Sequence, residues 1–134
     1  MPNLLCVSDE WSLGFKDLRA LADMGFNVVT AANGYEAVQL FSFRDIDAVV
    51  VNRKLPDLGV GTLARFCKAH KPGIPVIMLA NVMPSPQERI NEVDAVIAKT
   101  HAGGLLAPTL ELLLSIVEAN ESDVTGGEVQ EPAA

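Results

Sequence analysis

The stretch DAVVVNRKLPDLG, residues 47–59, predicts a buried β-strand that ends in a turn. The apolar run at residues 48–51 contains three β-branched valines, which favours a strand covered on both faces. Asn52, two basic residues and a Leu-Pro pair follow the run and end it. Many α/β proteins hold a reactive carboxylate directly after such a strand. An amide at residue 52 is therefore the feature that the rest of the sequence has to explain.

Strand-like and helix-like segments alternate five times along the chain. The short apolar segments that predict strands are residues 3–7, 27–31, 48–51, 75–80 and 95–98. Helices are predicted around residues 15–22, 35–41, 63–67, 86–93 and 104–119, of which the fourth is short and polar. This alternation predicts a parallel sheet with right-handed crossovers and helices on both faces. The expected fold class is an α/β domain with a doubly wound, five-stranded parallel sheet.

Composition and charge divide the chain into a body and a tail. With 134 residues, of which 49% are apolar, the chain can form the core of one domain. The net charge of −7 includes four acids in residues 121–134, where no basic residue stands, so the body is near −3 (−7 plus 4). The tail is also rich in Gly and has no periodicity. We therefore expect a domain over residues 1–120 and a disordered acidic tail over residues 121–134.

Composition also limits the partners. The acidic balance argues against general binding to nucleic acid or to an anionic membrane surface. No apolar run approaches the roughly 20 residues that span a bilayer, and residues 1–10 lack the pattern of a signal peptide, so we expect a cytoplasmic protein. Six basic or imidazole side chains around the third predicted helix predict a solvated helix face rather than a nucleic-acid site: Arg53, Lys54, Arg65, Lys68, His70 and Lys71.

In open parallel sheets, ligands bind beyond the carboxyl ends of the strands. Four of the predicted strands are followed there by the sequences SDE (8–10), NRK (52–54), AN (80–81) and KTH (99–101). Neither a nucleophile with a neighbouring base nor a Gly-rich phosphate loop stands among them. We therefore expect no catalytic residue and a protein that is not an enzyme.

The stretch from about residue 2 to residue 119 resembles the receiver domain of bacterial two-component response regulators. The resemblance rests on five motifs in the order and spacing of that family: LLCVSDE (4–10), NGYEAV (33–38), VVVNRKLPDL (49–58), IPVIMLAN (74–81) and VIAKT (96–100). It implies a flavodoxin-like (βα)5 fold and a role in phosphorelay signal transduction through protein partners.

The resemblance assigns the family's reaction site to residues 8–10, 52 and 54. The acidic pair that binds Mg²⁺ in the family is Ser8-Asp9 here, with Glu10 following. The phosphate-accepting aspartate is Asn52, and the backbone carbonyl of Lys54 would be a further metal ligand. An amide is not an anionic nucleophile, and Mg²⁺ prefers anionic oxygen. We therefore expect no aspartyl phosphorylation and no cofactor, with Mg²⁺ bound weakly at most by Asp9, Asn52 and Lys54.

Two switch residues of the family also differ. The Ser or Thr at the end of strand four is Ala80, and the aromatic residue of strand five is Val96. The lysine that contacts the phosphoryl group is retained as Lys99, but the proline after it is Thr100, so we expect a trans peptide bond there. The chain thus resembles a degenerate receiver, or pseudo-receiver, that works without phosphorylation. The alternative is an altered receiver that still responds to phosphate, Mg²⁺ or another small anion held by Lys99.

Other roles stay open for the acids near this site. Asp9 and Glu10 could cap the first helix or pair with Lys99 instead of binding metal. Asp57 follows the Leu-Pro pair, and we expect it to stabilise the turn rather than to replace Asn52 as the phosphate acceptor.

The last predicted helix carries two apolar stripes. One stripe should face the sheet: Leu106, Leu110, Leu113, Leu114 and Val117. A second consists of Leu105, Leu112 and Ile116, which a simple surface helix has no need to make apolar. Response-regulator receivers commonly use this side to dimerise or to bind partners. Our hypothesis is an interaction face for a signalling protein or a second copy, and the alternative is one broad stripe that packs on the sheet.

Overall fold

The computed structural model describes the backbone of residues 2–8 and 15–130, and the side chains of these residues except 15–18, 102 and 120–130. The strands are β1 (Asn3–Val7), β2 (Asn27–Ala31), β3 (Ala48–Asn52), β4 (Val76–Ala80) and β5 (Ala95–Ala98). The α-helices are α1 (Phe15–Asp23), α2 (Gly34–Phe43), α3 (Val60–His70) and α4 (Ala102–Gln130). Two short 3-10 helices are η1 (Pro86–Glu88) and η2 (Lys99–His101).

The five strands form one parallel sheet in the order β2-β1-β3-β4-β5. Strand β3 occupies the centre, where β1 and β4 pair with its two edges. The strand bounds agree within one residue with those that the apolar segments predict. The predicted fold class, a doubly wound five-stranded α/β domain, is confirmed.

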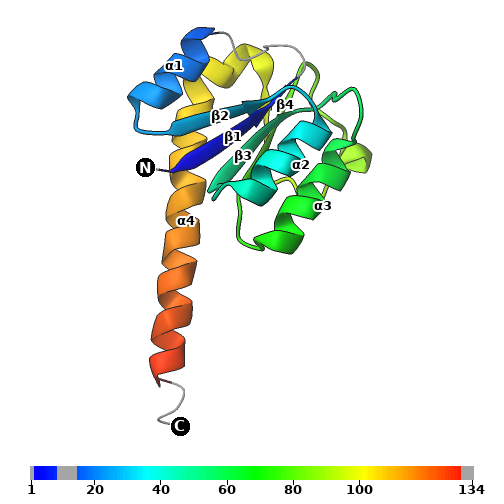
Figure 1. Ribbon diagram of the computed structural model, residues 1–134. Helices are drawn as coiled ribbons and strands as arrows, with labels where there is room; N and C mark the ends of the chain where they lie inside the picture. Colours follow the sequence, from blue (N-terminus) through cyan, green and yellow to red (C-terminus); the bar gives the residue numbers. More distant parts are fainter. Residues whose placement is uncertain (1, 9–14, 131–134) are drawn as a thin grey trace.

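Helices cover both faces of the sheet (Figure 1). On one face, α2 and α3 bury Phe41, Leu63 and Cys67 against alternate residues of the strands, such as Val49 and Met78. On the other face, α1 and α4 bury other side chains against the intervening strand residues: Leu21, Leu106 and Leu110 pack with Leu4, Val50 and Ile77. Because successive strand residues point to opposite faces, one continuous apolar strand supplies both cores.

The prediction of a helix over residues 86–93 is wrong. Only the three residues of η1, Pro86–Glu88, are helical between β4 and β5. Ser85 and Glu88 form a capping box around this turn, with Pro86 at its start. The next residues are mostly polar and bury too little apolar surface to extend it, because short helices depend on the packing of an apolar face. The crossover from β4 to β5 is therefore a loop of 14 residues, 81–94, with one helical turn.

The last helix also differs from its prediction. It begins at Ala102 and continues to Gln130, so it includes ten residues of the segment for which composition predicts disorder. Adding a residue to an existing helix needs no new nucleus, which favours this extension over a separate structure. Figure 1 shows that the carboxyl-terminal part of α4 extends beyond the sheet. No helix in the described part of the chain is both long and apolar enough to span a membrane.

Truncation of Leu110 to Ala should destabilise the domain by about 2–5 kcal/mol, because this side chain is fully buried between α4 and the sheet. Urea unfolding followed by circular dichroism measures the loss. Leu112→Ala is the matched control in the same helix: its side chain is 62% exposed, so the change should stay within about 0.5 kcal/mol. Equal losses in the two variants, at a concentration that keeps the chain monomeric, would contradict the assigned helix orientation.

Candidate functional site

The carboxyl ends of β1, β3, β4 and β5 bring together residues that are far apart in the sequence. Val7 is the register partner of Val51. Ser8, which follows β1, therefore lies level with Asn52, which ends β3. Ala80 is the partner of Ala98, which places Ala80 at the end of β4 level with the residue before Lys99. The register thus brings these candidate residues to one edge of the sheet, and their role as a site stays a prediction.

Asn52 is the one buried polar side chain among those that the structure describes, with 2% of its surface exposed. Its Nδ2 donates to the Ser8 hydroxyl oxygen at 3.5 Å. Its Oδ1 is buried and accepts no hydrogen bond from any described residue. A buried acceptor without a donor costs about 1–3 kcal/mol. The side chain of residue 52 is thus a neutral amide, which lacks the negative charge that makes a carboxylate a nucleophile or a metal ligand.

Asp9 and Glu10 lie outside the described residues, so their capping or metal role stays a prediction. Lys99 starts η2 directly after β5 and is half-buried. It forms no ion pair with any described side chain. The Lys99–Thr100 peptide bond is trans.

The described residues do not fit a resident Mg²⁺ ion. The oxygens available from Ser8, Asn52 and Lys54 belong to a hydroxyl, an amide and a backbone carbonyl, and none is charged. Protein sites for Mg²⁺ commonly use one or two carboxylates. Among the described residues, no group of three or more His, Cys, Asp or Glu side chains is placed to hold a metal.

The two switch residues lie in different surroundings. Ala80 is completely buried, and its methyl group offers no hydroxyl to a ligand in the site. Val96 is half-buried in β5 and is the register partner of Met78. It stands two residues before Ala98, or about 6–7 Å along the strand from the level of the site. Val96 therefore lines a different part of the sheet, below the loop at residues 81–94.

Asp57 connects the turn after β3 to the start of α2. Its carboxylate accepts hydrogen bonds from the backbone nitrogens of Gly34 and Tyr35, at 2.9 and 3.0 Å. A Cβ at residue 34 would overlap the side chain of Leu58, so glycine is what allows this close approach. Desolvation raises the pKa of Asp57, but these backbone donors lower it more, and the pKa lies below its ordinary value of 3.8. Asp57 thus binds the start of α2, 22 and 23 residues away in the sequence, and the turn pattern alone did not indicate this contact.

The basic cluster around α3 has internal partners that the sequence analysis missed. Arg53, Arg65 and Lys68 pair with three acids of the loop before β5: Glu88 at 2.7 Å, Glu92 at 3.7 Å and Asp94 at 2.7 Å. Lys71 pairs with Asp45 and Asp47 at the other end of the sheet. The sequence did contain a signal for these pairs, because bases at residues 53, 65 and 68 are followed by acids at residues 88, 92 and 94. Four of the six members of the cluster are thus ion-paired within the domain.

The three apolar side chains assigned to an interaction face are exposed. Leu105, Leu112 and Ile116 are 50%, 62% and 46% exposed, whereas Leu106 and Leu110 of the same helix are buried. Packing on the sheet therefore does not explain why these three residues are apolar. Their role in an interface stays a prediction.

Replacement of Asp57 by Ala should destabilise the junction of α2 with the turn at pH 7. The pKa of Asp57 is lowered in the folded chain, so its contribution is present above the unfolded pKa and is lost as the pH falls through the folded value. The gap in unfolding free energy between the natural chain and Asp57→Ala should shrink between pH 7 and pH 3. Asn33→Ala is the control, because it removes a neutral cap of the same helix, in which Asn33 Oδ1 accepts from the Glu36 nitrogen at 2.8 Å. The difference in unfolding free energy between the natural chain and Asn33→Ala should not depend on the charge of Asp57. A gap for Asp57→Ala that is constant with pH would contradict the role of the ionised carboxylate.

Sequence comparison relates part of the chain to transcriptional regulators. No protein-family model matches it. The transcriptional regulatory protein CusR of Escherichia coli K12 is 30% identical over 76 residues, which are 57% of this chain and 34% of CusR. The probable transcriptional regulator ycf27 of Cyanidium caldarium is 35% identical over 78 residues, 58% of this chain and 30% of the relative. The chain thus spans about a third of the length of these curated relatives.

Solved receiver domains share the architecture of the whole body. A CheY-like response regulator receiver domain from Methanospirillum hungatei superposes with a TM-score of 0.81 at 20% identity, over 90% of this chain and 98% of that one. The receiver domain of a histidine kinase from Syntrophus aciditrophicus gives 0.74 at 25% identity, over 86% and 91%. TrrA of Thermotoga maritima, solved with Mg²⁺ and beryllofluoride, gives 0.75 at 22% identity, over 84% and 99%. The chain therefore has the receiver-domain fold of response regulators.

Proposed function

We propose that this domain is a receiver-like signalling module of a two-component or phosphorelay pathway that acts by protein contact, without phosphorylation of an aspartate. The observation that carries the proposal is the buried amide of Asn52 at the carboxyl end of the central strand. The receiver fold, the order of the five motifs and the partial identity to two transcriptional regulators support a regulatory role. No catalytic residue is assigned.

The amide prevents the family's reaction for a chemical reason. A carboxylate attacks a phosphoryl donor through an anionic oxygen, whereas the lone pair of an amide nitrogen is delocalised into its carbonyl. Asn52 therefore cannot form an acyl phosphate. The neutral oxygens of Ser8 and Asn52 also attract Mg²⁺ poorly, which weakens the charge stabilisation that phosphoryl transfer requires.

The remaining parts of the family's switch are consistent with this reading. Ala80 has no hydroxyl that could move onto a phosphoryl group, and Val96 has no ring that could fill the space left behind. A fold without these parts can still present the surfaces of a receiver to a partner. We expect one predominant conformation that depends little on phosphate.

A second candidate function is an altered receiver that responds to phosphate, Mg²⁺ or another small anion. The observation in its favour is Lys99, a half-buried cation at the site that has no ion-pair partner among the described side chains. A bound anion would supply the negative charge that Lys99 lacks among the described side chains.

An amide NMR titration of the full chain distinguishes the two functions. Mg²⁺ and then beryllofluoride are added to the natural chain and to Asn52→Asp. The natural chain should show no saturable shifts at Ser8, Asn52 or Lys99, while the variant, which regains a carboxylate, should gain Mg²⁺-dependent shifts. Saturable shifts in the natural chain that spread into β5 and α4 would instead establish the second function.

We further propose that Leu105, Leu112 and Ile116 form the face through which the module contacts protein, either a second copy or another signalling protein. Leu112→Glu should abolish self-association, because a desolvated charge in an apolar interface is unfavourable. Sedimentation velocity over a range of concentrations measures it. Gln39→Glu adds the same charge to an exposed residue of α2 and should leave self-association unchanged. A natural chain that stays monomeric at every concentration would exclude the second copy as the partner.

A further inference from the structure

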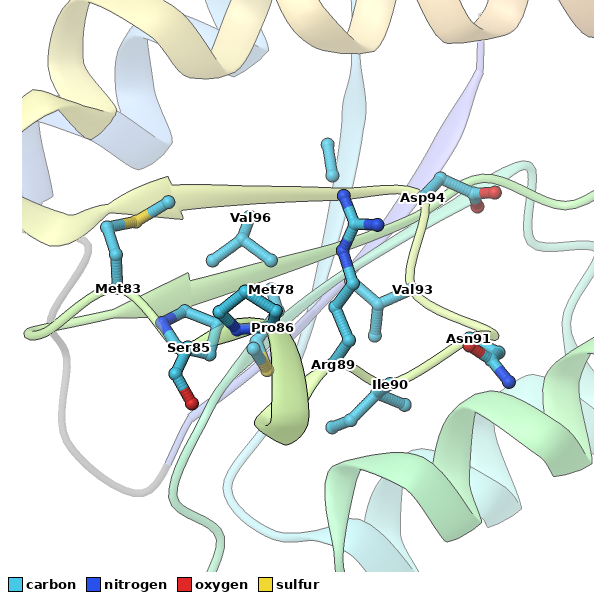
Figure 2. Close-up of a pocket in the computed structure, with 12 residues that line it drawn as sticks. Met78, Met83, Ser85, Pro86, Arg89, Ile90, Asn91, Val93, Asp94 and Val96 are labelled. Atoms are coloured by element: carbon cyan, nitrogen blue, oxygen red, sulfur yellow. The ribbon is translucent and has the colours of Figure 1, made fainter.

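A cavity of about 660 Å³ lies between the loop at residues 81–94 and the strands β4 and β5. Figure 2 shows its lining, with Met78 and Val96 on the strands and Pro86, Arg89 and Ile90 on the loop. It is separate from the site around Asn52, since neither Asn52, Ser8 nor Lys99 lines it.

The cavity exists because the crossover from β4 to β5 holds only one helical turn. Met78 packs on the same face of the sheet as the side chains of α2 and α3, and Val96 lies against that core. A longer helix after η1 would bury this part of the sheet. The loop, with Pro84 and Pro86 at its start, leaves the space open instead.

The size and lining of the cavity suit a small molecule. Its volume falls within the roughly 300–1,000 Å³ typical of ligand sites. On the sheet side, the half-buried Val96 offers apolar surface, and its register partner Met78 lines the cavity with only 1% of its surface exposed. Met83, Ile90 and Val93 supply further apolar surface from the loop. Such a lining favours a ligand with an apolar body.

The loop that covers the cavity is held at several points. Arg53 donates to the carbonyl oxygen of Val82 at 3.1 Å and to the Glu88 carboxylate at 2.7 Å. The carboxylate of Asp94 accepts from Lys68 at 2.7 Å and from the backbone nitrogen of Val76 at 2.8 Å. The pKa of Glu88 is lowered, first by the backbone and hydroxyl of Ser85 and then by Arg53. These contacts shape the cavity before any ligand arrives, which reduces the cost of binding.

The charges of the loop leave one cation at the cavity. Its three acids, Glu88, Glu92 and Asp94, are all paired with bases of α3 or of the turn after β3, and the acid that lines the cavity, Asp94, is neutralised by Lys68 at 2.7 Å. Arg89 lines the cavity and has no ion-pair partner among the described residues. In Figure 2 its side chain extends from the loop toward the sheet. An unpaired guanidinium beside an apolar wall favours a ligand that is both apolar and anionic.

We propose that this cavity binds a small amphipathic carboxylate, with its apolar body against Met83, Ile90 and Val96 and its carboxylate on the guanidinium of Arg89. A planar guanidinium can donate two parallel hydrogen bonds to a carboxylate, which fixes the orientation of the ligand. The inference goes beyond the signalling function proposed above and does not depend on the chemistry of Asn52. It gives the domain a ligand site distinct from the carboxyl ends of β1 and β3.

Octanoate is the probe for this site, and the full chain is titrated with it by amide NMR. Saturable shifts should appear at Met78, Met83, Arg89 and Val96 and should be absent at Ser8 and Asn52. Octylammonium, with the same apolar body and the opposite charge, should bind at least tenfold more weakly. Shifts centred on Asn52 and Lys99, or equal binding of the two probes, would overturn the proposal.

Two variants test the assigned contacts. Arg89→Gln should weaken octanoate binding by about tenfold to a hundredfold, the loss expected for a charge-assisted hydrogen bond. Arg44→Gln removes another exposed arginine, one that does not line the cavity, and should leave the affinity unchanged. Val96→Phe should also weaken binding, because its ring takes up part of the apolar wall that the ligand would contact, and thermal unfolding checks that this variant is folded. An unchanged affinity in Arg89→Gln, or an absence of saturable binding in the natural chain, would refute the site.

Discussion

The burial of β3 on both faces and both edges is the constraint on which the rest of the structure depends. All five residues of Ala48–Asn52 are buried, with β1 and β4 on the edges and a helical layer on each face. A strand in this position must be apolar along its length, and its last residue is carried into the interior at the carboxyl edge of the sheet. Asn52 is therefore buried by the architecture, whatever its chemistry.

The consequence for function is that residue 52, the last residue of the central strand, is a neutral amide where a receiver has its phosphate-accepting carboxylate. A buried carboxylate needs a cation or a metal nearby, whereas a buried amide needs only hydrogen-bond partners. The Nδ2 of Asn52 donates to the Ser8 hydroxyl, and its Oδ1 accepts from none of the residues that the structure describes. The site is thus compatible with a stable fold without metal. The shortest described ion pairs lie elsewhere, between Arg53 or Lys68 and acids of the loop before β5.

The sequence predicted the sheet well and the β4 to β5 crossover poorly. Strands buried on both faces have a continuous apolar pattern that few other structures share, so their bounds could be predicted within one residue. The segment 86–93 has no comparable signal, because a short polar helix and a loop have similar sequences. The partners of Asp57 and Arg53 could not be predicted either, since 22 to 35 residues separate the bonded groups. Contacts of that separation depend on how the elements are packed.

By itself, the sequence determined the fold class, the edge of the sheet at which the candidate site residues lie and the absence of a carboxylate at residue 52. These follow from local composition and from the rule that parallel strands end at a common edge. Only the tertiary structure decided that three bases near α3 bind acids of the same chain, that Leu112 faces outward, and that a cavity lies beside Val96. The physical reason is that pairing, exposure and empty space are relations between elements. A residue's type limits these relations, but the packing of the helices and loops on the sheet selects among them.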